Sequence, residues 1–303
     1  MLCLLFWAFI GLALLWKVYQ WVLWITCRPD YTGKIVFISG GSSGIGENLA
    51  KHIVNLGAKK VIIAARRQTE LERVVNECKE QSTKLETCVL DLNNPEECLQ
   101  TCKELFNKHE VDIVINCGGC SQRDAFEDLD FSVCIQMMNV NCMSHIAVCK
   151  AAFPGMVKRK RGQFVNVLSV AGYLGTPMRT MYSASKFGLS GFGKVLRCEG
   201  REHGIEVTQV YPSYVQTNIS KNALTGDGSK FGKLDANVKK GISADKCVNQ
   251  ILKAMTLNIA EMTIGSTMYK VIYHVATVLP QFVTDYGSDK IMKKQRLVKA
   301  KAS

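Results

Sequence analysis

The stretch Ile35-Val36-Phe37-Ile38-Ser39-Gly40-Gly41-Ser42-Ser43-Gly44-Ile45-Gly46 decides how the rest of the chain is arranged. Four apolar residues, typical of a buried strand, lead directly into a turn rich in glycine and serine. Such a turn before a helix lets the backbone approach a pyrophosphate, and the helix N-terminus offers N–H donors. A plain tight turn is the alternative, but the position after a strand favours a nucleotide site. The candidate ligands are Ser39, Gly40, Ser42, Ser43, Gly44, Ile45 and Gly46.

Beyond this turn, apolar runs alternate with amphipathic stretches. Strands that alternate with helices indicate a parallel sheet covered on both faces. The sequence therefore predicts an α/β fold with one Rossmann-type, doubly wound parallel sheet in a catalytic domain at 28–265. Residues 218–240 are expected to form a mobile loop. The expected strands are 35–39, 60–65, 86–90, 111–116, 164–168 and 206–211, and the expected helices lie near 45–56, 68–80, 95–109, 131–157, 182–203 and 243–257.

The N-terminal stretch is almost wholly apolar and contains four tryptophans, with Lys17 and Gln20 as its polar interruptions. A helix of this length brackets the roughly 30 Å hydrocarbon core of a bilayer. No positive segment precedes it and no small-x-small cleavage site follows, which favours a retained anchor over a cleaved signal. We therefore predict a membrane anchor at 1–27. A buried helix of a soluble protein and a helix or hairpin in one leaflet are the alternatives.

The composition of the chain further limits the class of protein and the partners to be expected. The chain has 303 residues, 47% of them hydrophobic, and a net charge of +12, which suits a globular protein with a basic surface. No zinc-finger spacing, basic heptad or RNA-binding signature accompanies the charge, so we expect no nucleic-acid partner. The 13 cysteines are odd in number and scattered, which favours free thiols in a reducing compartment. The five histidines are isolated, and no metal site is expected.

A second motif is Met181-Tyr182-Ser183-Ala184-Ser185-Lys186. Its tyrosine and lysine are four residues apart, so on a helix both side chains lie on one face. A free phenol has a pKa of about 10 and carries protons poorly at neutral pH, whereas a neighbouring ammonium favours the phenolate. The pair is a candidate acid/base device, although the same spacing also occurs by chance on surface helices.

Together, the glycine-rich turn, Asn141, Ser169 and the Tyr182–Lys186 pair resemble the short-chain dehydrogenase/reductase family over about residues 30–260. Three further stretches resemble a membrane-associated branch of that family, called dehydrogenase/reductase family member 7. They are Ala65-Arg66-Arg67, Gly118-Gly119-Cys120-Ser121-Gln122-Arg123 and Val215-Gln216-Thr217-Asn218-Ile219.

The resemblance implies a catalytic role for each of four residues. Tyr182 would protonate a carbonyl oxygen, and Lys186 would favour its phenolate and bind the cofactor ribose. Ser169 would orient the carbonyl, and Asn141 would hold a water that passes protons to Lys186. Ser169 could instead be a structural strand-end hydroxyl, and Asn141 a polar group inside a helix.

The cofactor is expected to be NADP(H). Ala65 ends the second strand where an acid would bind a ribose 2′-hydroxyl, and the arginine that follows can pair with a 2′-phosphate. Three departures from the family pattern are Cys117-Gly118 in the Asn-Asn-Ala-Gly motif, Ser213 after Pro212, and Leu168 before the serine. The further cofactor residues implied by the resemblance are Arg66, Arg67, Asp91, Leu92, Asn116, Gly118, Val215 and Thr217, besides Tyr182 and Lys186.

The sequence thus predicts a membrane-anchored oxidoreductase that acts on a lipophilic alcohol or ketone, such as a steroid, retinoid or long-chain keto lipid. A catalytically silent nucleotide-binding scaffold or sensor is the alternative. The resemblance implies a homodimer or homotetramer. Residues 266–303 would hold an apolar segment and a basic tail.

The predicted location is the endoplasmic-reticulum membrane, with the catalytic domain in the cytosol. Arg28 and Lys34 follow the apolar segment, and the positive-inside bias places them in the cytosol. The terminal Lys299-Ala300-Lys301-Ala302-Ser303 resembles a K-x-K-x-x retrieval signal, which works only in the cytosol. The sequon Asn218-Ile219-Ser220 points the other way, but a glycan there would obstruct the presumed site at Thr217.

Overall fold

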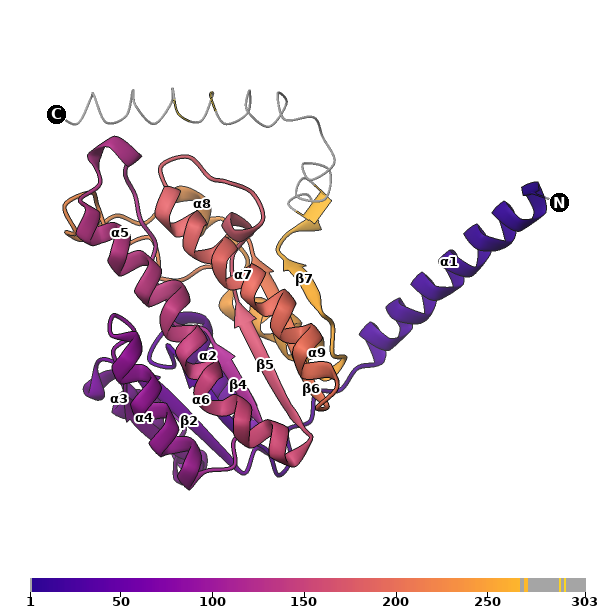
Figure 1. Ribbon diagram of the computed structural model, residues 1–303, viewed down its shortest axis with the longest axis horizontal. Coiled ribbons are helices and arrows are strands. Elements are labelled where there is room, and N and C mark those ends of the chain that lie inside the picture. The colour runs from indigo at the N-terminus through magenta and orange to yellow at the C-terminus, as the bar shows by residue number, and fades with distance from the viewer. Residues whose placement is uncertain (1, 268–269, 272–288, 290–291, 293–303) are drawn as a thin grey trace.

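The computed structural model describes residues 2–267, 270–271, 289 and 292. Within these residues a seven-stranded parallel sheet, in the order β3-β2-β1-β4-β5-β6-β7, forms the centre of the molecule (Figure 1). This order is that of a doubly wound sheet and confirms the predicted fold class. The strands are β1 Ile35–Ser39, β2 Lys60–Ala65, β3 Leu85–Val89, β4 Ile113–Asn116, β5 Gly162–Val167, β6 Ile205–Pro212 and β7 Glu261–Ile264.

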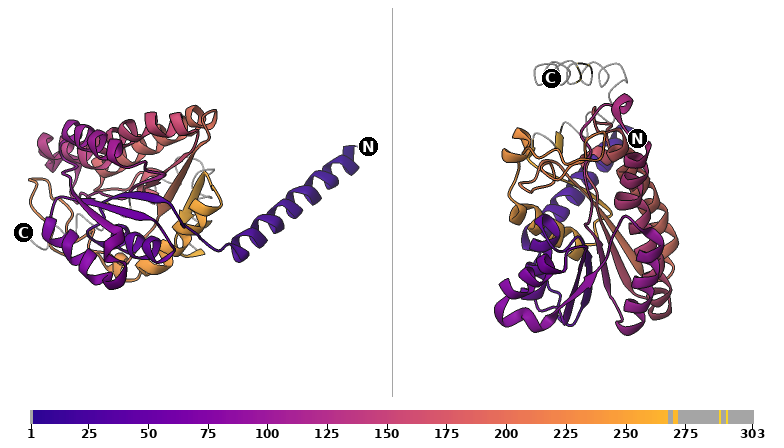
Figure 2. Two further views of the ribbon diagram at one scale, coloured as in Figure 1. Left: turned by 90° about the horizontal axis from the view of Figure 1, so that it is seen from below. Right: turned by 90° about the vertical axis from the view of Figure 1, so that its left-hand side faces the viewer.

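Helices cover both faces of the sheet, as the right-hand view of Figure 2 shows. One face carries α2 Gly44–Asn55, α3 Gln68–Glu77 and α9 Ala244–Thr256. The other face carries α4 Pro95–Lys108, α6 Ser144–Arg159 and α7 Thr180–Arg201. Successive residues of β1 point to opposite faces: Val36 and Ile38 pack against the first group of helices and Phe37 against the second. The apolar run at 35–38 therefore serves both faces of the sheet.

The structure differs from the predicted elements in two places. The helix expected at 131–157 is divided into α5 Phe131–Met138, a π-helical turn at Asn139–Met143, and α6. A short edge strand, β7, follows α9 and was not predicted. The segment expected to be a loop at 218–240 is irregular and contains the one-turn helix α8 Ala236–Lys239, with Ala223 fully buried.

Helix α1, Leu2–Thr26, extends away from the body of the molecule (Figure 1). Its 25 residues span about 37 Å at 1.5 Å per residue, and its window Phe9–Thr26 is apolar enough to cross a membrane. The stretch Phe131–Arg159 passes the same test of length and composition, but it packs on the sheet. Much of the C-terminal segment expected at 266–303 lies outside the described residues.

Candidate active site

A cleft of about 520 Å³ opens at the carboxyl ends of the strands. It lies at the point where the chain leaves β1 and β4 in opposite directions, because α2 covers one face and the helices that follow β4 cover the other. Doubly wound sheets bind ligands at such switch points. The glycine-rich turn after β1 forms one end of the cleft, and the Tyr182 region forms its middle.

The backbone of the glycine-rich turn is shaped for close approach to a phosphate. Gly40 has φ +72°, and a Cβ on it would lie 2.5 Å from Cα of Gly118 on the neighbouring strand end. Ser43 is the N-cap of α2, but its side chain makes no capping hydrogen bond. The first N–H groups of α2 are therefore available to an anion, as a dinucleotide pyrophosphate would require.

Most of the predicted site residues line this cleft, and three lie behind its wall. Ser39 is fully buried, and its hydroxyl oxygen accepts hydrogen bonds from the N–H groups of Cys117 (3.2 Å) and Gly118 (3.3 Å). Asn116 donates to Asn166 Oδ1 at 2.9 Å on the next strand. These two side chains hold the strand ends together. The predicted residues on the lining are Gly40, Ser42, Ser43, Gly44, Ile45, Gly46, Arg66, Arg67, Asp91, Leu92, Gly118, Ser169, Tyr182, Lys186, Val215 and Thr217.

The third residue behind the wall is Asn141, in the π-helical turn. Its amide closes a loop by accepting from Cys120 N and donating to Cys120 O, both at 2.9 Å, and it also donates to Ser185 Oγ at 3.2 Å. A π-helical turn often marks a functional position in a long helix. Here it brings the amide of Asn141 and the amine of Lys186 to the same glycine, Gly119.

Three of the four candidate catalytic side chains, those of Ser169, Tyr182 and Lys186, line the cleft. Tyr182 and Lys186 lie one turn apart on α7, and both are at least 95% buried. Lys186 Nζ donates to the carbonyl of Val167 at the end of β5, at 3.1 Å. Ser169 follows β5 by two residues and accepts from Ala171 N at 3.2 Å. The end of β5 therefore positions the hydroxyl, and the first turns of α7 position the phenol and the amine.

The arginine pair predicted to bind phosphate lies between the end of β2 and the start of α3. The Arg66 side chain is 66% exposed, and its nearest carboxylate is that of Asp91, at 3.9 Å from Nε. Arg67 is the N-cap of α3 and also lines the cleft. An exposed and loosely paired guanidinium is free to meet a phosphate. The exposure of Arg66 and the position of Arg67 on the cleft thus suit the 2′-phosphate that the sequence suggested.

Sequence reasoning missed the role of His145, which it treated as an isolated packing residue. The ring is fully buried on α6, and its Nε2 lies 2.8 Å from the carbonyl oxygen of Gly118. Burial, together with the charge of Lys186, lowers the pKa of His145 to about 3. The ring is therefore neutral at physiological pH, and Nε2–H donates to Gly118, which fixes the strand end that faces Gly40.

A C-x-x-C spacing, Cys117-Gly118-Gly119-Cys120, was also overlooked in the sequence. The structure packs its two thiols into different clusters: Cys117 joins the α2 side of the core, and Cys120 contacts Met137 on α5. Burial raises the pKa of Cys117 to about 12 and that of Cys120 to about 11. Both are packing thiols in the reduced state. No group of three or more metal-ligating side chains occurs among the residues that the structure describes.

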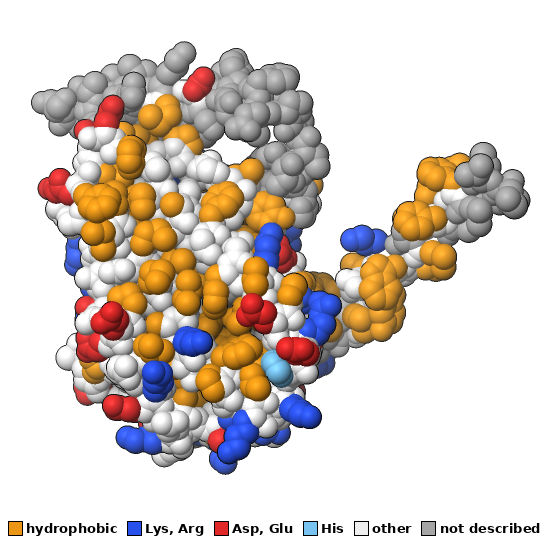
Figure 3. Space-filling view, in the orientation of Figure 1, with side chains coloured by type: hydrophobic (Ala, Val, Ile, Leu, Met, Phe, Trp, Pro, Cys, Tyr) orange, Lys and Arg blue, Asp and Glu red, His pale blue; other side chains and the backbone are white. Residues whose placement is uncertain are grey.

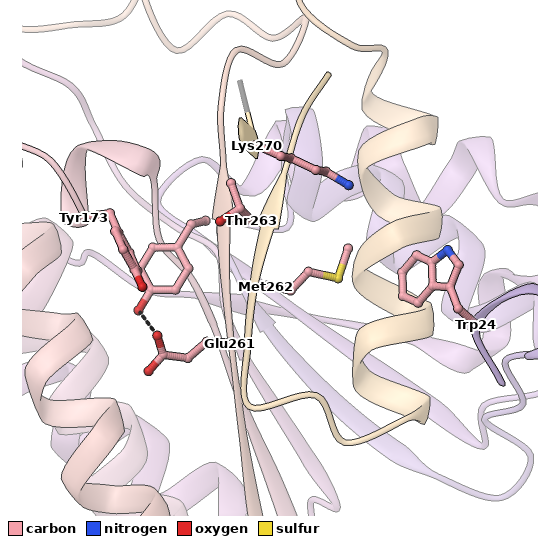
Figure 4. Close-up of a pocket in the computed structure, with 7 residues that line it drawn as sticks. Trp24, Tyr173, Glu261, Met262, Thr263 and Lys270 are labelled. Atoms are coloured by element: carbon pink, nitrogen blue, oxygen red, sulfur yellow. Dashed lines mark hydrogen bonds between the residues drawn. The ribbon is translucent and has the colours of Figure 1, made fainter. Parts of the chain in front are cut away.

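A second hollow, of about 360 Å³, lies at the β7 edge of the sheet (Figure 4). Tyr211 donates to Glu261 Oε2 at 3.5 Å inside it, the bond drawn as a dashed line. Trp24 and Lys270 also contribute to the wall. This hollow shares no lining residue with the catalytic cleft. It lies between the end of α1 and the edge of the sheet.

Comparisons with known proteins agree with the fold and the motifs. A model of the short chain dehydrogenase family matches residues 34–228. The chain is 36% identical over 260 residues to a dehydrogenase/reductase SDR family protein 7-like of Drosophila melanogaster, covering 84% of this chain and 79% of that protein. It is 33% identical to dehydrogenase/reductase SDR family member 7 of Mus musculus, covering 81% and 75%.

Two solved structures show the same fold at low identity. A short-chain dehydrogenase from Sphingobium yanoikuyae in complex with NADPH gives a TM-score of 0.68 at 21% identity, covering 82% of this chain and 97% of that one. A short chain dehydrogenase/reductase from Burkholderia phymatum in complex with NAD gives a TM-score of 0.68 at 18% sequence identity. The match covers 78% of this chain and 90% of that one. The two hold different cofactors, so the choice between them must be argued from this chain's own residues.

Proposed function

This chain belongs to the short-chain dehydrogenase family, and on that premise we propose that it is an NADP(H)-dependent oxidoreductase that interconverts a lipophilic alcohol and ketone. The observation that carries the proposal is the joint placement of Ser169, Tyr182 and Lys186 on one cleft beside the glycine-rich turn. A scaffold that only senses a nucleotide has no need of all three side chains together with Asn141.

The chemistry follows from what each side chain can do. The bound cofactor supplies or accepts the hydride. Tyr182 gives a proton to the carbonyl oxygen in reduction and takes it back in oxidation. Lys186 lies one turn from Tyr182 on α7. Its positive charge would stabilise the tyrosine oxygen after proton transfer, and its amine would bind the ribose. The Ser169 hydroxyl would donate to the oxygen that develops negative charge. A water held by Asn141 would connect Lys186 to solvent and replace the proton taken from Tyr182.

Three features support NADP(H) as the cofactor. Ala65 at the end of β2 leaves no carboxylate to repel a 2′-phosphate. Arg66 and Arg67 both line the cleft there. An arginine–phosphate contact is charge-assisted and often bidentate, so it outweighs the loss of a hydroxyl contact.

We also propose that α1 anchors the enzyme in the endoplasmic-reticulum membrane, with the catalytic domain in the cytosol. None of the described side chains in the window Phe9–Thr26 is buried, and an apolar helix with exposed tryptophans suits a bilayer better than water. An anchored active site meets substrates that dissolve in the membrane, which supports a steroid, retinoid or long-chain keto lipid. The retrieval-like signal at the C-terminus lies outside the described residues.

The proposed protein partner is a second copy of the chain, in a dimer or tetramer. Figure 3 shows apolar side chains gathered over the face that α5, α6 and α7 form. The residues Phe131, Ile135, Phe187 and Val195 on α5 and α7, and Met143 in the π-helical turn, are each 45–78% exposed. Exposed apolar groups of this kind favour association, and sedimentation velocity of the detergent-solubilised protein gives the assembly size.

The function is tested by a screen for cofactor oxidation. Full-length protein in mild detergent is mixed with NADPH or NADH and panels of steroid ketones, retinaldehydes and long-chain keto lipids. We expect turnover with NADPH on at least one lipophilic carbonyl. Activity confined to small polar sugars or hydroxy acids would overturn the substrate class, and no turnover with any panel would favour the silent scaffold.

A further inference from the structure

The described charged side chains at the end of the catalytic cleft beyond Tyr182 are all positive. Among the described residues that line this end, the charged side chains are Arg123, Arg179 and Lys230, and all three are cations. The carboxylate on the described lining is that of Asp91, which lies beside Arg66. A lipophilic pocket built for a neutral ketone has no need of three cations.

Two of these arginines converge from distant parts of the chain. Arg123 Nη2 lies 3.1 Å and Arg179 Nη2 3.5 Å from one oxygen, Oδ2 of Asp235. The backbone holds them together, because Asp124 N donates to the carbonyl of Met178 at 3.2 Å. Arg179 is the N-cap of α7, three residues before Tyr182. Arg179 is therefore built into the same turn as the proton donor, and the Asp124–Met178 hydrogen bond holds the Arg123 segment beside it.

In the cluster of Arg123, Arg179 and Asp235, two positive charges share one negative charge. The side chains of Arg123 and Arg179 are 12% and 15% exposed, so both are largely withdrawn from water. They share one oxygen of Asp235, whose other oxygen accepts from Asn237 N at 2.8 Å as the cap of α8. Each guanidinium has five N–H donors, of which this contact engages one nitrogen. Two buried cations on one carboxylate retain a strong preference for a further anion.

The neighbouring surface is apolar. Leu224, Ile219 and Val238 line the same end of the cleft as the two arginines. A ligand that fits both features has a hydrocarbon body and one negative charge. We propose that Arg123 and Arg179 bind a carboxylate or phosphate of an amphiphilic substrate, whose ketone or alcohol lies at Tyr182. This inference rests on the proposed function and narrows its substrate class.

Binding without turnover provides the first test. Decanoate, decyl phosphate and decanol are titrated, below their micelle concentrations, into full-length protein saturated with NADPH. We expect the two anions to bind roughly 10- to 100-fold more tightly than decanol, the range of a charge-assisted contact. The better of the two anions identifies the headgroup. Equal affinity for decanol and both anions would overturn the proposal.

Variants separate anion recognition from a purely structural role. Arg123→Gln and Arg179→Gln should each reduce the preference for the anion at least tenfold, and Arg179→Lys should restore part of it. Asp235→Asn should increase the preference, because it removes the competing charge and keeps an oxygen for the Asn237 N–H. If Asp235→Asn instead lowers the preference as the arginine variants do, the arginines only hold α8, and the proposal is wrong.

A matched control is Arg201→Gln at the exposed far end of α7, which should leave anion affinity unchanged. Turnover is measured in parallel on a long-chain keto acid and its methyl ester. Selective anion binding without turnover of either compound would contradict the proposed function, and only the anion site at Arg123 and Arg179 would stand. Turnover of both with equal kcat/KM would contradict this inference and leave the proposed function standing.

Discussion

Arg66 is the residue whose side chain decides between the two nicotinamide cofactors in this account. It follows β2 and is mostly exposed, and its nearest carboxylate among the described residues is that of Asp91, 3.9 Å from Nε. Arg66→Ala should raise the Kd for NADPH about 10- to 100-fold, because a charge-assisted contact contributes roughly 1.5–3 kcal/mol. The Kd for NADH should change little. Fluorescence titration measures both.

The control for this prediction is Arg161→Ala, an exposed arginine that precedes β5 and is remote from the cleft lining. It should leave both affinities as they are. An equal loss of NADPH and NADH affinity in Arg66→Ala would mean that Arg66 does not bind a 2′-phosphate.

His145 gives a pH dependence whose sign is fixed by its burial. Its pKa falls from 6.5 to about 3 in the folded protein. The unfolded chain therefore binds a proton below about pH 6.5 while the folded chain does not, and stability is lost as pH falls from there toward 3. Between pH 6.5 and 5 the loss is about 2 kcal/mol, at 1.36 kcal/mol per unit.

The variant His145→Gln tests this assignment. Glutamine keeps an N–H for Gly118 and cannot be protonated, so its loss of stability between pH 6.5 and 5 should be about 2 kcal/mol smaller than that of the wild type. Thermal unfolding at the two pH values measures it. The same pH dependence in both proteins would show that His145 titrates normally.

At the scale of elements, α1 is tied to the catalytic domain through α9. Lys253 Nζ donates to the carbonyl of Trp24 at 2.9 Å, near the C-terminus of α1, and lies 5.4 Å from the centre of the Trp24 ring. A cation there stabilises the helix end and the aromatic face together. These contacts would set how far the active site stands from the membrane.

Lys253→Gln should loosen this attachment by about 1 kcal/mol, roughly fivefold in local opening. Subtilisin should then cut the segment at 27–34 correspondingly faster in detergent-solubilised protein. Lys246→Gln, on the first turn of the same helix, is the matched control and should not change the rate. Unchanged cleavage in Lys253→Gln would mean that the contact does not hold α1.

The elements that the sequence allowed us to predict are those with strong local patterns. The strands β2, β1, β4 and β5 are largely apolar runs flanked by glycine or charged residues. The predicted bounds of β1 and β2 agree with the structure. Strand β7 was missed because four residues at a sheet edge are too few to show alternation. The π-helical turn was missed because it depends on Asn141 bonding the distant Cys120.

The distinction between local sequence patterns and tertiary contacts also applies to the candidate active site. Tyr182, Lys186 and the glycine-rich turn could be predicted because their spacing within one helix or turn brings them together. Arg123 and Arg179 could not, because they meet on Asp235, more than fifty residues from either in the sequence, through tertiary structure. That the chain belongs to the short-chain dehydrogenase family is confirmed, while the domain boundaries and the individual site roles stay predictions.

At the scale of the whole molecule, the proposed orientation of the enzyme in the membrane rests on α1 and on the charges that follow it. Arg28 and Lys34 follow the helix directly, so the positive-inside bias favours a cytosolic catalytic domain. Protease added to intact microsomes should degrade the catalytic domain. A lumenal marker protein, protected until detergent is added, controls for leakage. Protection of the catalytic domain until detergent is added would reverse the orientation.

The central claim is that Tyr182 moves the proton in a reaction that uses the bound cofactor, and one comparison tests it most directly. Tyr182→Phe removes the hydroxyl and little volume from a buried site. NADPH oxidation by this variant, with a lipophilic ketone that the wild type reduces, is measured alongside NADPH affinity. The account predicts turnover reduced at least a hundredfold, the range of general acid catalysis, with the Kd for NADPH nearly unchanged. Turnover at the wild-type rate would contradict it.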